Sequence, residues 1–334
     1  MTLNSQKPLR RRSVRFAVAA LAVPALFLTA CSEGAAGGGG GGGGTNALSI
    51  AAGGTGGVFY PLGGGIATMI GTDIEGYNAT VQETNASVDN LLLIENGAAD
   101  LALVVGDVVS DAVEGVGAFD ANPVDICSLG NLYNNYMQLV TSAGTGIENV
   151  EDMRGMRVSV GSPSSATEVG AIRILEIAGI DVETDIDRRQ LGAAETADAL
   201  RDGTIDAGFW SGGLPTGALV DYASTGDMVL VPFGEYADGL ATEFGEYYVE
   251  QDIPADTYDG QAEAVSVIVS PNLLVASNTM DETLQEQITA AIFDNKDALI
   301  QVHPAAEELD PTTAGDVPYI TTCAGAQTYF DQAG

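Results

Sequence analysis

Short apolar runs recur along the chain, each followed by a polar or glycine-rich turn. The first run, at 48–52, breaks into four glycines around Thr55, and apolar positions resume at helical spacing over 62–70. A short apolar run bounded by turn residues indicates a buried strand, and the later spacing indicates a helix. The pattern therefore predicts a strand, a turn and a helix at the start of the folded part.

The same unit returns three more times. Repeated strand, loop and helix units predict an α/β fold with mainly parallel sheets, whose ligands bind at the carboxyl ends of the strands. Because two turns lie in the first third of the chain and two in the middle, we expect one cleft between two lobes. The later strands are predicted at 80–83, 158–160 and 206–210, their turns at 84–87, 161–168 and 211–215, and helices at 88–95 and 169–178.

Three further features complete the predicted fold. Ser87 precedes the helix at 88–95 and is predicted to be its N-cap. A long strand is predicted at 126–141. Helices at 282–302 and 324–332 are expected to pack on the first lobe and to carry no chemistry.

The glycine turn at 53–57 is a candidate anion site. Glycines leave backbone N–H groups bare and let a ligand approach closely, and the helix behind them adds a positive dipole end. The alternative is an ordinary strand-to-helix turn. No Lys-Ser or Lys-Thr follows the glycines, and Phe59 stands where a G-x-G-x-x-G motif needs its third glycine. The turn therefore favours a small anion or zwitterion over a nucleotide.

Residues 1–30 resemble an export signal rather than part of the fold. Five basic residues precede an apolar segment at 16–28, and Leu-Thr-Ala-Cys at 28–31 resembles a lipoprotein cleavage box. Cys31 is then the predicted lipidation site; a plain secretory signal that contains a cysteine is the alternative. Residues 31–46, with eight consecutive glycines, are predicted to be a flexible tether.

The remaining chain is long enough for two lobes and strongly acidic. About 290 residues exceed one typical core. Five of the 12 basic residues precede residue 30, whereas all 46 acidic ones follow it. No basic patch is available to neutralise phosphates, which excludes nucleic acid as a partner. Six of the seven later basic residues fall within 154–201, which would favour an anion locally.

The sequence favours a binding protein over an enzyme. A hydrolase needs a base beside its nucleophile, but His303 is the only histidine and no G-x-S-x-G elbow is present; nor is a metal-binding constellation or cofactor motif. In an exported protein, two cysteines beyond the lipidated one more often pair than stay free, so Cys127 and Cys323 are predicted to form a disulfide. Trp210, the sole tryptophan, is expected in the cleft; a buried core ring is the alternative.

Four segments resemble the TAXI-type solute receptors, which serve tripartite ATP-independent periplasmic (TRAP) transporters. The resemblance runs from about residue 47 to the end and is most specific in the first block. The blocks are GGTGGVFYP at 53–61, TNASVDN at 84–90, VGSPSSAT at 160–167 and DAGFWSGGLP at 206–215, with NLLV at 272–275 and HPAA at 303–306 in support.

This resemblance implies a type II periplasmic-binding-protein fold, with lobe 1 formed by 45–135 and 275–334, lobe 2 by 136–274, and a hinge crossed twice. It implies no cofactor, a small carboxylate ligand such as glutamate or a related C5 acid, and a TRAP permease as membrane partner. The protein would act outside the cytoplasm, lipid-anchored or periplasmic. A binding protein of the same fold that serves an ABC importer or a sensor is the alternative.

The ligand contacts are expected at the four turns and at two aromatic residues. Tyr60 and Tyr133 could equally be core aromatics. The expected contacts are Gly53, Thr55, Gly56, Gly57, Tyr60, Asn85, Ser87, Tyr133, Ser162, Ser165, Thr167, Trp210, Ser211 and Gly212.

Overall fold

The structure, a computed structural model, describes residues 46–225 and 227–333. The predicted signal at 1–30, the predicted lipidation site Cys31 and nearly all of the predicted tether lie outside the described residues. Within the described part, every helix is too short or too polar to cross a bilayer.

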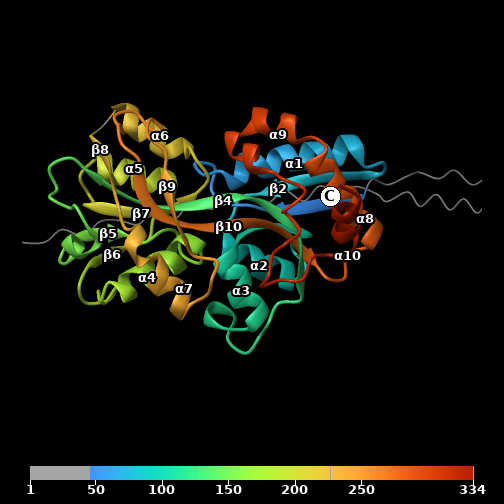
Figure 1. The fold of residues 1–334 in the computed structure, drawn as a ribbon, viewed down its shortest axis with the longest axis horizontal. Coiled ribbons are helices and arrows are strands. Elements are labelled where there is room, and N and C mark those ends of the chain that lie inside the picture. The colour runs from blue at the N-terminus through green and yellow to red at the C-terminus, as the bar shows by residue number, and fades with distance from the viewer. Residues whose placement is uncertain (1–45, 226, 334) are drawn as a thin grey trace, which may run out of the picture. The chain divides into compact units, whose positions relative to one another are not determined.

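Ten strands form one continuous mixed sheet in the order β2-β1-β3-β10-β4-β7-β5-β6, with β8 added on β4 and β9 on β10. Figure 1 shows β4 and β10 running together through the middle of this sheet. The strands are β1 (Asn46–Ala51), β2 (Tyr77–Gln82), β3 (Leu101–Val105), β4 (Ile126–Ser142), β5 (Arg157–Ser159), β6 (Asp187–Arg189), β7 (Ala207–Gly212), β8 (Met228–Val231), β9 (Val249–Ile253) and β10 (Val265–Ser277).

Pairing in the sheet is only partly parallel, contrary to the mainly parallel sheets expected from the sequence. β1 pairs with β2 and β3 in parallel, and β5 pairs with β6 and β7 in parallel. β4 and β10, however, pair antiparallel with each other and with β7 and β3. These two long strands run from one parallel group into the other, so each group is closed by antiparallel neighbours.

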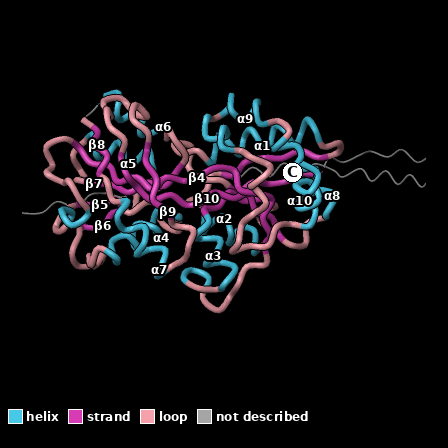
Figure 2. The backbone as a smooth tube through the Cα atoms, viewed as in Figure 1, coloured by secondary structure: helices cyan, strands magenta, loops and turns pink. Residues whose placement is uncertain are grey.

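The two crossings by β4 and β10 make this a two-lobed α/β fold of the type II periplasmic-binding-protein kind, which confirms the predicted fold class. Helices cover both faces of the sheet in each lobe, as Figure 2 shows. The α-helices are α1 (Phe59–Asp73), α2 (Ser87–Glu95), α3 (Gly106–Glu114), α4 (Ala166–Ile177), α5 (Ala193–Arg201), α6 (Gly217–Thr225), α7 (Ala237–Glu243), α8 (Glu282–Phe293), α9 (Lys296–Val302) and α10 (Ala324–Ala333).

Four short 3₁₀ helices lie in the loops of the described part. They are η1 (Gly117–Phe119), η2 (Val150–Met153), η3 (Gly234–Tyr236) and η4 (Pro304–Glu308).

The single helix predicted at 282–302 is instead two helices. α8 ends at Phe293, and α9 begins at Lys296. Between them, the amide of Asn295 donates to the backbone oxygen of Ala291 and to the carboxylate of Asp73, both at 2.9 Å. A short amide side chain that bonds the backbone offers it an alternative to the helix, which explains the break.

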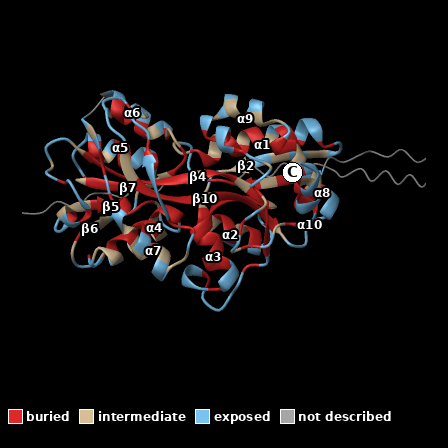
Figure 3. Ribbon diagram, viewed as in Figure 1, coloured by how far each residue is buried: buried red, intermediate tan, exposed pale blue. Residues whose placement is uncertain are grey.

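Each lobe has its own apolar core (Figure 3). One cluster draws its buried residues from 48–133 and 273–330, together with Ala166, and the other draws them from 136–269. The chain therefore passes from the first core into the second along β4 and returns along β10.

The predicted disulfide between Cys127 and Cys323 is confirmed. Cys127 lies in β4, and Cys323 directly precedes α10. A bridge between Ser128 and Thr322 accompanies the disulfide. The C-terminal helix is thus fastened to the core of the first lobe.

Candidate ligand-binding cleft

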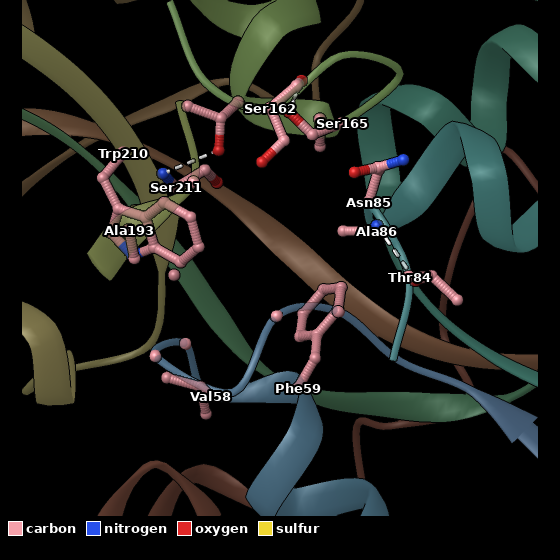
Figure 4. Close-up of a pocket in the computed structure, with 18 of the residues that line it drawn as sticks. Val58, Phe59, Thr84, Asn85, Ala86, Ser162, Ser165, Ala193, Trp210 and Ser211 are labelled. Carbon is pink, nitrogen blue, oxygen red and sulfur yellow. Dashed lines mark hydrogen bonds between the residues drawn. The ribbon is translucent and has the colours of Figure 1, made fainter. Parts of the chain in front are cut away.

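A cavity of about 510 Å³ lies between the lobes, and residues of both line it (Figure 4). We call this cavity the cleft. Its volume falls within the range of about 300–1,000 Å³ that is usual for small-molecule sites. Lobe 1 contributes 53–59, 83–87, Asp89 and Val105, and lobe 2 contributes Ser162, 165–167, 192–195, Asp198 and 210–212.

Four helices begin at the cleft, α1 and α2 from lobe 1 and α4 and α5 from lobe 2. The first N–H groups of a helix have no partner within it. The residues that precede α1, α2 and α5 (Val58, Ala86 and Gly192) provide no side-chain cap, whereas Ser165 caps α4 by accepting from the N–H of Glu168. Free N–H groups and positive dipole ends therefore converge on the cleft from both sides.

The glycine turn of lobe 1 touches lobe 2 directly. A Cβ placed on Gly57 would lie 2.9 Å from ring carbon Cζ2 of Trp210, and one on Gly56 would lie 3.2 Å from Cβ of Ala194. Real Cβ atoms essentially never approach a neighbour within 3.0 Å. The contact between Gly57 and Trp210 therefore requires glycine at position 57, whether or not Gly57 also contacts a ligand.

Two backbone hydrogen bonds join the lobes beside the cleft. The N–H of Ala218 donates to the carbonyl of Gly56, and the N–H of Asp89 donates to the carbonyl of Ser164, both at 3.3 Å. Each bond has one partner in each lobe. The structure therefore shows the lobes closed over the cleft.

Trp210 lies on the cleft, as the sequence predicted (Figure 4). Its indole N–H donates to the hydroxyl of Thr216 at 3.1 Å, which fixes the ring. The next residue, Ser211, donates its N–H to the hydroxyl of Thr167 at 3.1 Å. These bonds tie the end of β7 to the start of α4, so both walls of lobe 2 keep their relative position.

Ser87 does not cap α2, contrary to the prediction. It is the first residue of the helix, and its hydroxyl accepts from the N–H of Val105 at 3.2 Å. Nearby, the amide of Asn90 donates to the carbonyls of Ala52 and Leu103. Ser87 and Asn90 thus hold the ends of β1 and β3 against α2, which positions the lobe 1 wall.

Ala86, directly before α2, has a strained backbone. Its φ is 76° and its ψ is −150°, a combination that is essentially restricted to glycine. The N–H of Ala86 donates to the hydroxyl of Thr84 at 3.0 Å. This conformation turns the chain abruptly from β2 into α2 at the edge of the cleft.

Twelve of the fourteen expected contact residues line the cleft, and Tyr60 and Tyr133 do not. Tyr133 is 1% exposed, and its ring packs against Gly213. Burial raises the pKa of the Tyr133 hydroxyl well above its usual value. Tyr60 is half-buried in the first turn of α1.

Several cleft residues were not anticipated from the sequence. The largest group is 192–195 at the start of α5; Val58, Phe59, Glu83 and Asp89 also line the cleft. The available signal was Gly192 followed by a glutamate three residues later, a spacing typical of helix starts. Indeed, the Glu195 carboxylate accepts from the N–H of Gly192 at 2.7 Å.

No arginine, lysine or histidine is among the residues that line the cleft. All six arginines of the described part form ion pairs with protein carboxylates. The cluster of basic residues between 154 and 201 therefore does not reach the ligand site. Four carboxylates line it instead, those of Glu83, Asp89, Glu195 and Asp198.

One ion pair joins the lobes outside the cleft. Arg173 of α4 contacts Asp111 of α3 at 2.7 Å, and both side chains are largely buried. Arg173 also donates to the hydroxyl of Tyr248, which donates to Asp107 at 2.8 Å. Burial disfavours the charge of Arg173, but the neighbouring Tyr248, Asp107 and Asp111 outweigh it and raise its pKa. Burial raises the pKa of Asp107 and of Asp111, against the pull of Arg173.

Within the described residues, no three His, Cys, Asp or Glu side chains are grouped so that they could hold a metal ion. The cleft offers N–H groups, hydroxyls, two aromatic rings and carboxylates. Such a set can bind and orient a small polar molecule.

Comparison with known proteins gives one family. The sequence model described as the NMT1-like family matches residues 50–334.

The fold also resembles solved structures of low sequence identity. A protein from Bordetella bronchiseptica RB50 is 16% identical, with a TM-score of 0.51 over 85% of this chain and 82% of that one. The periplasmic aliphatic sulphonate binding protein from Escherichia coli is 13% identical, with a TM-score of 0.46 over 86% and 79%. A putative L-cystine ABC transporter protein from Listeria monocytogenes is 14% identical, with a TM-score of 0.46 over 77% and 93%.

Proposed function

The chain belongs to the NMT1-like family, and on that premise we propose that it is an extracytoplasmic solute receptor. It encloses a small carboxylate between its lobes and presents it to a membrane transporter. One observation carries the proposal: four helix N-termini, two from each lobe, open into a single cleft of about 510 Å³.

The cleft supports capture of an anionic group without a charged partner. Each hydrogen bond contributes about 1 kcal/mol net, and more when one partner is charged. Several such bonds suffice for a dissociation constant of roughly 1 μM, which corresponds to about −8 kcal/mol. The twelve predicted contact residues that line the cleft are the proposed ligand contacts. Six of them come from lobe 2, namely Ser162, Ser165, Thr167, Trp210, Ser211 and Gly212.

Ligand release requires the lobes to separate. Opening breaks the bonds from Ala218 to Gly56 and from Asp89 to Ser164, and bends β4 and β10. A ligand that contacts both lobes favours the closed state by its differential affinity. The transporter would distinguish the two states.

Two membrane partners are proposed. Of the three similar structures described above, one is named as an ABC transporter protein and one as a periplasmic sulphonate binding protein, so an ABC importer is the first partner to test. The motifs at 53–61, 84–90, 160–167 and 206–215 resemble TAXI-type receptors, so a TRAP permease is the second. An ATPase gene beside this one would support the importer, and a many-spanning permease gene without an ATPase would support the TRAP transporter.

The resemblance to TAXI-type receptors suggests the ligand, and the cleavage box at 28–31 suggests the anchor. Glutamate and related C5 acids are the first ligands to test. Lipid attached to Cys31 would hold the receptor at the outer face of the membrane.

Titration of the purified chain with C5 compounds tests the proposal. A ligand should raise the melting temperature by mass action and change the emission of Trp210, the sole tryptophan. Ser162→Ala, on the cleft, should weaken binding about five- to tenfold, because a neutral hydrogen bond contributes about 1 kcal/mol. Ser224→Ala, outside the cleft, should leave binding unchanged. If no small carboxylate changes either signal, the chain is not this kind of receptor.

A further inference from the structure

The cleft carries unbalanced negative charge. Glu83 and Asp89 from lobe 1 and Glu195 from lobe 2 all line it, and none of the three forms an ion pair with a described residue. Asp198 also lines the cleft, but it pairs with Arg201. These three carboxylates, called free here because no cation of the described part pairs with them, flank the cleft from both lobes.

The cations that could balance this charge are committed elsewhere. Each arginine of the described part pairs with a carboxylate, and Lys296 donates to the carbonyl of Leu309 at 2.6 Å. Bringing any of the arginines into the cleft would break an ion pair. An anionic ligand therefore meets only N–H groups and hydroxyls, together with three carboxylates that repel it.

The neutral donors suit one carboxylate better than two. A single carboxylate can be held by the free N–H groups at the helix starts, with favourable dipoles. A second anionic group in the same cavity would approach Glu83, Asp89 or Glu195. Repulsion between two unit charges about 4 Å apart weakens binding roughly fivefold even in bulk water, and more where water is excluded.

The aromatic lining independently favours a cationic group. Phe59 and Trp210 both line the cleft, from lobe 1 and lobe 2 respectively (Figure 4). The indole N–H of Trp210 is occupied by Thr216 and one edge of the ring lies against Gly57, so Trp210 offers the cleft carbon surface rather than a donor. Aromatic rings attract ammonium groups through their quadrupoles, and tryptophan does so best.

We infer that the ligand is a zwitterion of net charge zero, with one carboxylate and one ammonium or quaternary ammonium group. This rests on the receptor function proposed above. The carboxylate lies at the helix starts, and the ammonium group lies toward the free carboxylates and the rings. The inference narrows the ligand class away from dicarboxylic acids.

Glu83 distinguishes a role of the carboxylates in ligand binding from a role in holding the loops. Asp89 and Glu195 each accept one backbone N–H, from Asn85 and Gly192, so holding these loops would be reason enough for their presence. Glu83 is exposed on the cleft, and no hydrogen bond to it is found among the described residues. Its carboxylate has no such structural task.

Three C5 compounds form a matched charge series for the test. Glutamine has net charge zero, glutamate −1 and 2-oxoglutarate −2, on the same carbon skeleton; 5-aminovalerate adds a second neutral zwitterion. Dissociation constants are measured for each with the full chain, at low salt and at about 1 M NaCl, where the Debye length falls to about 3 Å. At low salt, we expect the dissociation constants of the zwitterions to be at least about tenfold lower than that of 2-oxoglutarate. At high salt, this difference in dissociation constants should become smaller.

Glu83→Gln then measures the charge effect itself. At low salt, this variant should lower the dissociation constant of 2-oxoglutarate divided by that of glutamine about two- to tenfold, because one repelling charge is removed. Glu75→Gln removes the same charge from an exposed position of lobe 1 outside the cleft, and should leave that ratio unchanged.

The outcomes separate this inference from the receptor function. If 2-oxoglutarate binds as tightly as the zwitterions, or if Glu83→Gln moves the ratio no more than Glu75→Gln, the chain remains a receptor but the charge inference is wrong. If no compound of the series binds at about 10 mM, the proposed receptor function for these acids fails, and the inference fails with it.

Discussion

Ala86 holds a strained backbone conformation at the edge of the cleft. Its φ of 76° and ψ of −150° suit glycine, and such a conformation costs about 1–3 kcal/mol. Glycine would relieve this strain but would lose more entropy on folding. Ala86→Gly should therefore raise the free energy of unfolding by about 1 kcal/mol in a denaturant titration. Ala290→Gly, within α8, should lower it by about 1 kcal/mol, and equal losses for both would disprove the strain.

Gly57 permits closure, and a methyl group there should prevent it. Its Cβ would lie 2.9 Å from the ring of Trp210. Gly57→Ala should weaken ligand binding at least about tenfold, which corresponds to about 1.4 kcal/mol, while the melting temperature without ligand stays near the wild type. Gly64→Ala in α1 has open space around it and should leave affinity unchanged. Unchanged affinity in Gly57→Ala would mean that ligand binding does not need this contact.

Residue types were easier to predict than the directions of side chains. Trp210 and Tyr133 are both aromatic residues within strands, yet one lines the cleft and the other is 1% exposed. Which face of a strand a residue takes depends on pairing register, and β4 has register shifts around Asn272 and Leu274 of its partner β10. Likewise, Ser87 looks like a cap in sequence, but its hydroxyl instead accepts from the N–H of Val105 in β3.

At the scale of elements, the pair of Arg173 and Asp111 joins α4 of one lobe to α3 of the other. Removing one partner of a buried pair leaves an uncompensated charge and typically costs about 3–5 kcal/mol. Arg173→Met should therefore lower the free energy of unfolding by about that amount. Arg189→Met, in the exposed pair with Asp187, should cost less than about 1 kcal/mol.

A double-variant cycle checks that the two charges act together. Arg173→Met combined with Asp111→Leu should cost clearly less than the sum of the single changes, because neither charge is then left alone. Strict additivity would show that the pair does not couple α3 to α4.

The four strand-turn-helix units could be predicted because their signals are local. Glycine, hydroxyl residues and apolar periodicity around 53–57 or 161–168 lie within a few positions of each other. The start of α5 was missed because its preceding strand, β6, has only three residues, two of them arginines. At the break between α8 and α9, Asn295 also contacts Asp73, which lies more than 200 positions away. Contacts at such separations leave no periodic signal in the sequence.

The charge of the whole chain sets its response to salt. With 46 acidic and 12 basic residues, repulsion opposes the compact state, and ions screen that repulsion. The melting temperature should therefore rise between low and about 1 M NaCl, and KCl at equal ionic strength should raise it equally. A melting temperature that stays flat or falls would show that the folded state does not carry this repulsion.

Two lobes were predictable from chain length, but the connection between them was not. The sequence predicts mainly parallel sheets, but β4 and β10 pair antiparallel with each other and with one strand of each parallel group. The long apolar segment at 126–141 reads as one strand, and nothing local in it marks where the first core ends and the second begins. That boundary exists only because helices from distant parts of the chain pack on each half.

The pairing of β4 with β10 also restricts how the receptor can move. The strands are hydrogen-bonded neighbours from Ile126 and Ser277 to Met137 and Ile268, across the boundary between the cores. Bending one strand without the other would break the hydrogen bonds between them. The lobes therefore rotate about one hinge axis rather than about two independent hinges. A single spectroscopic distance between one label on each lobe, measured across the cleft, should then report the whole opening motion, because the lobes have no second independent way to move.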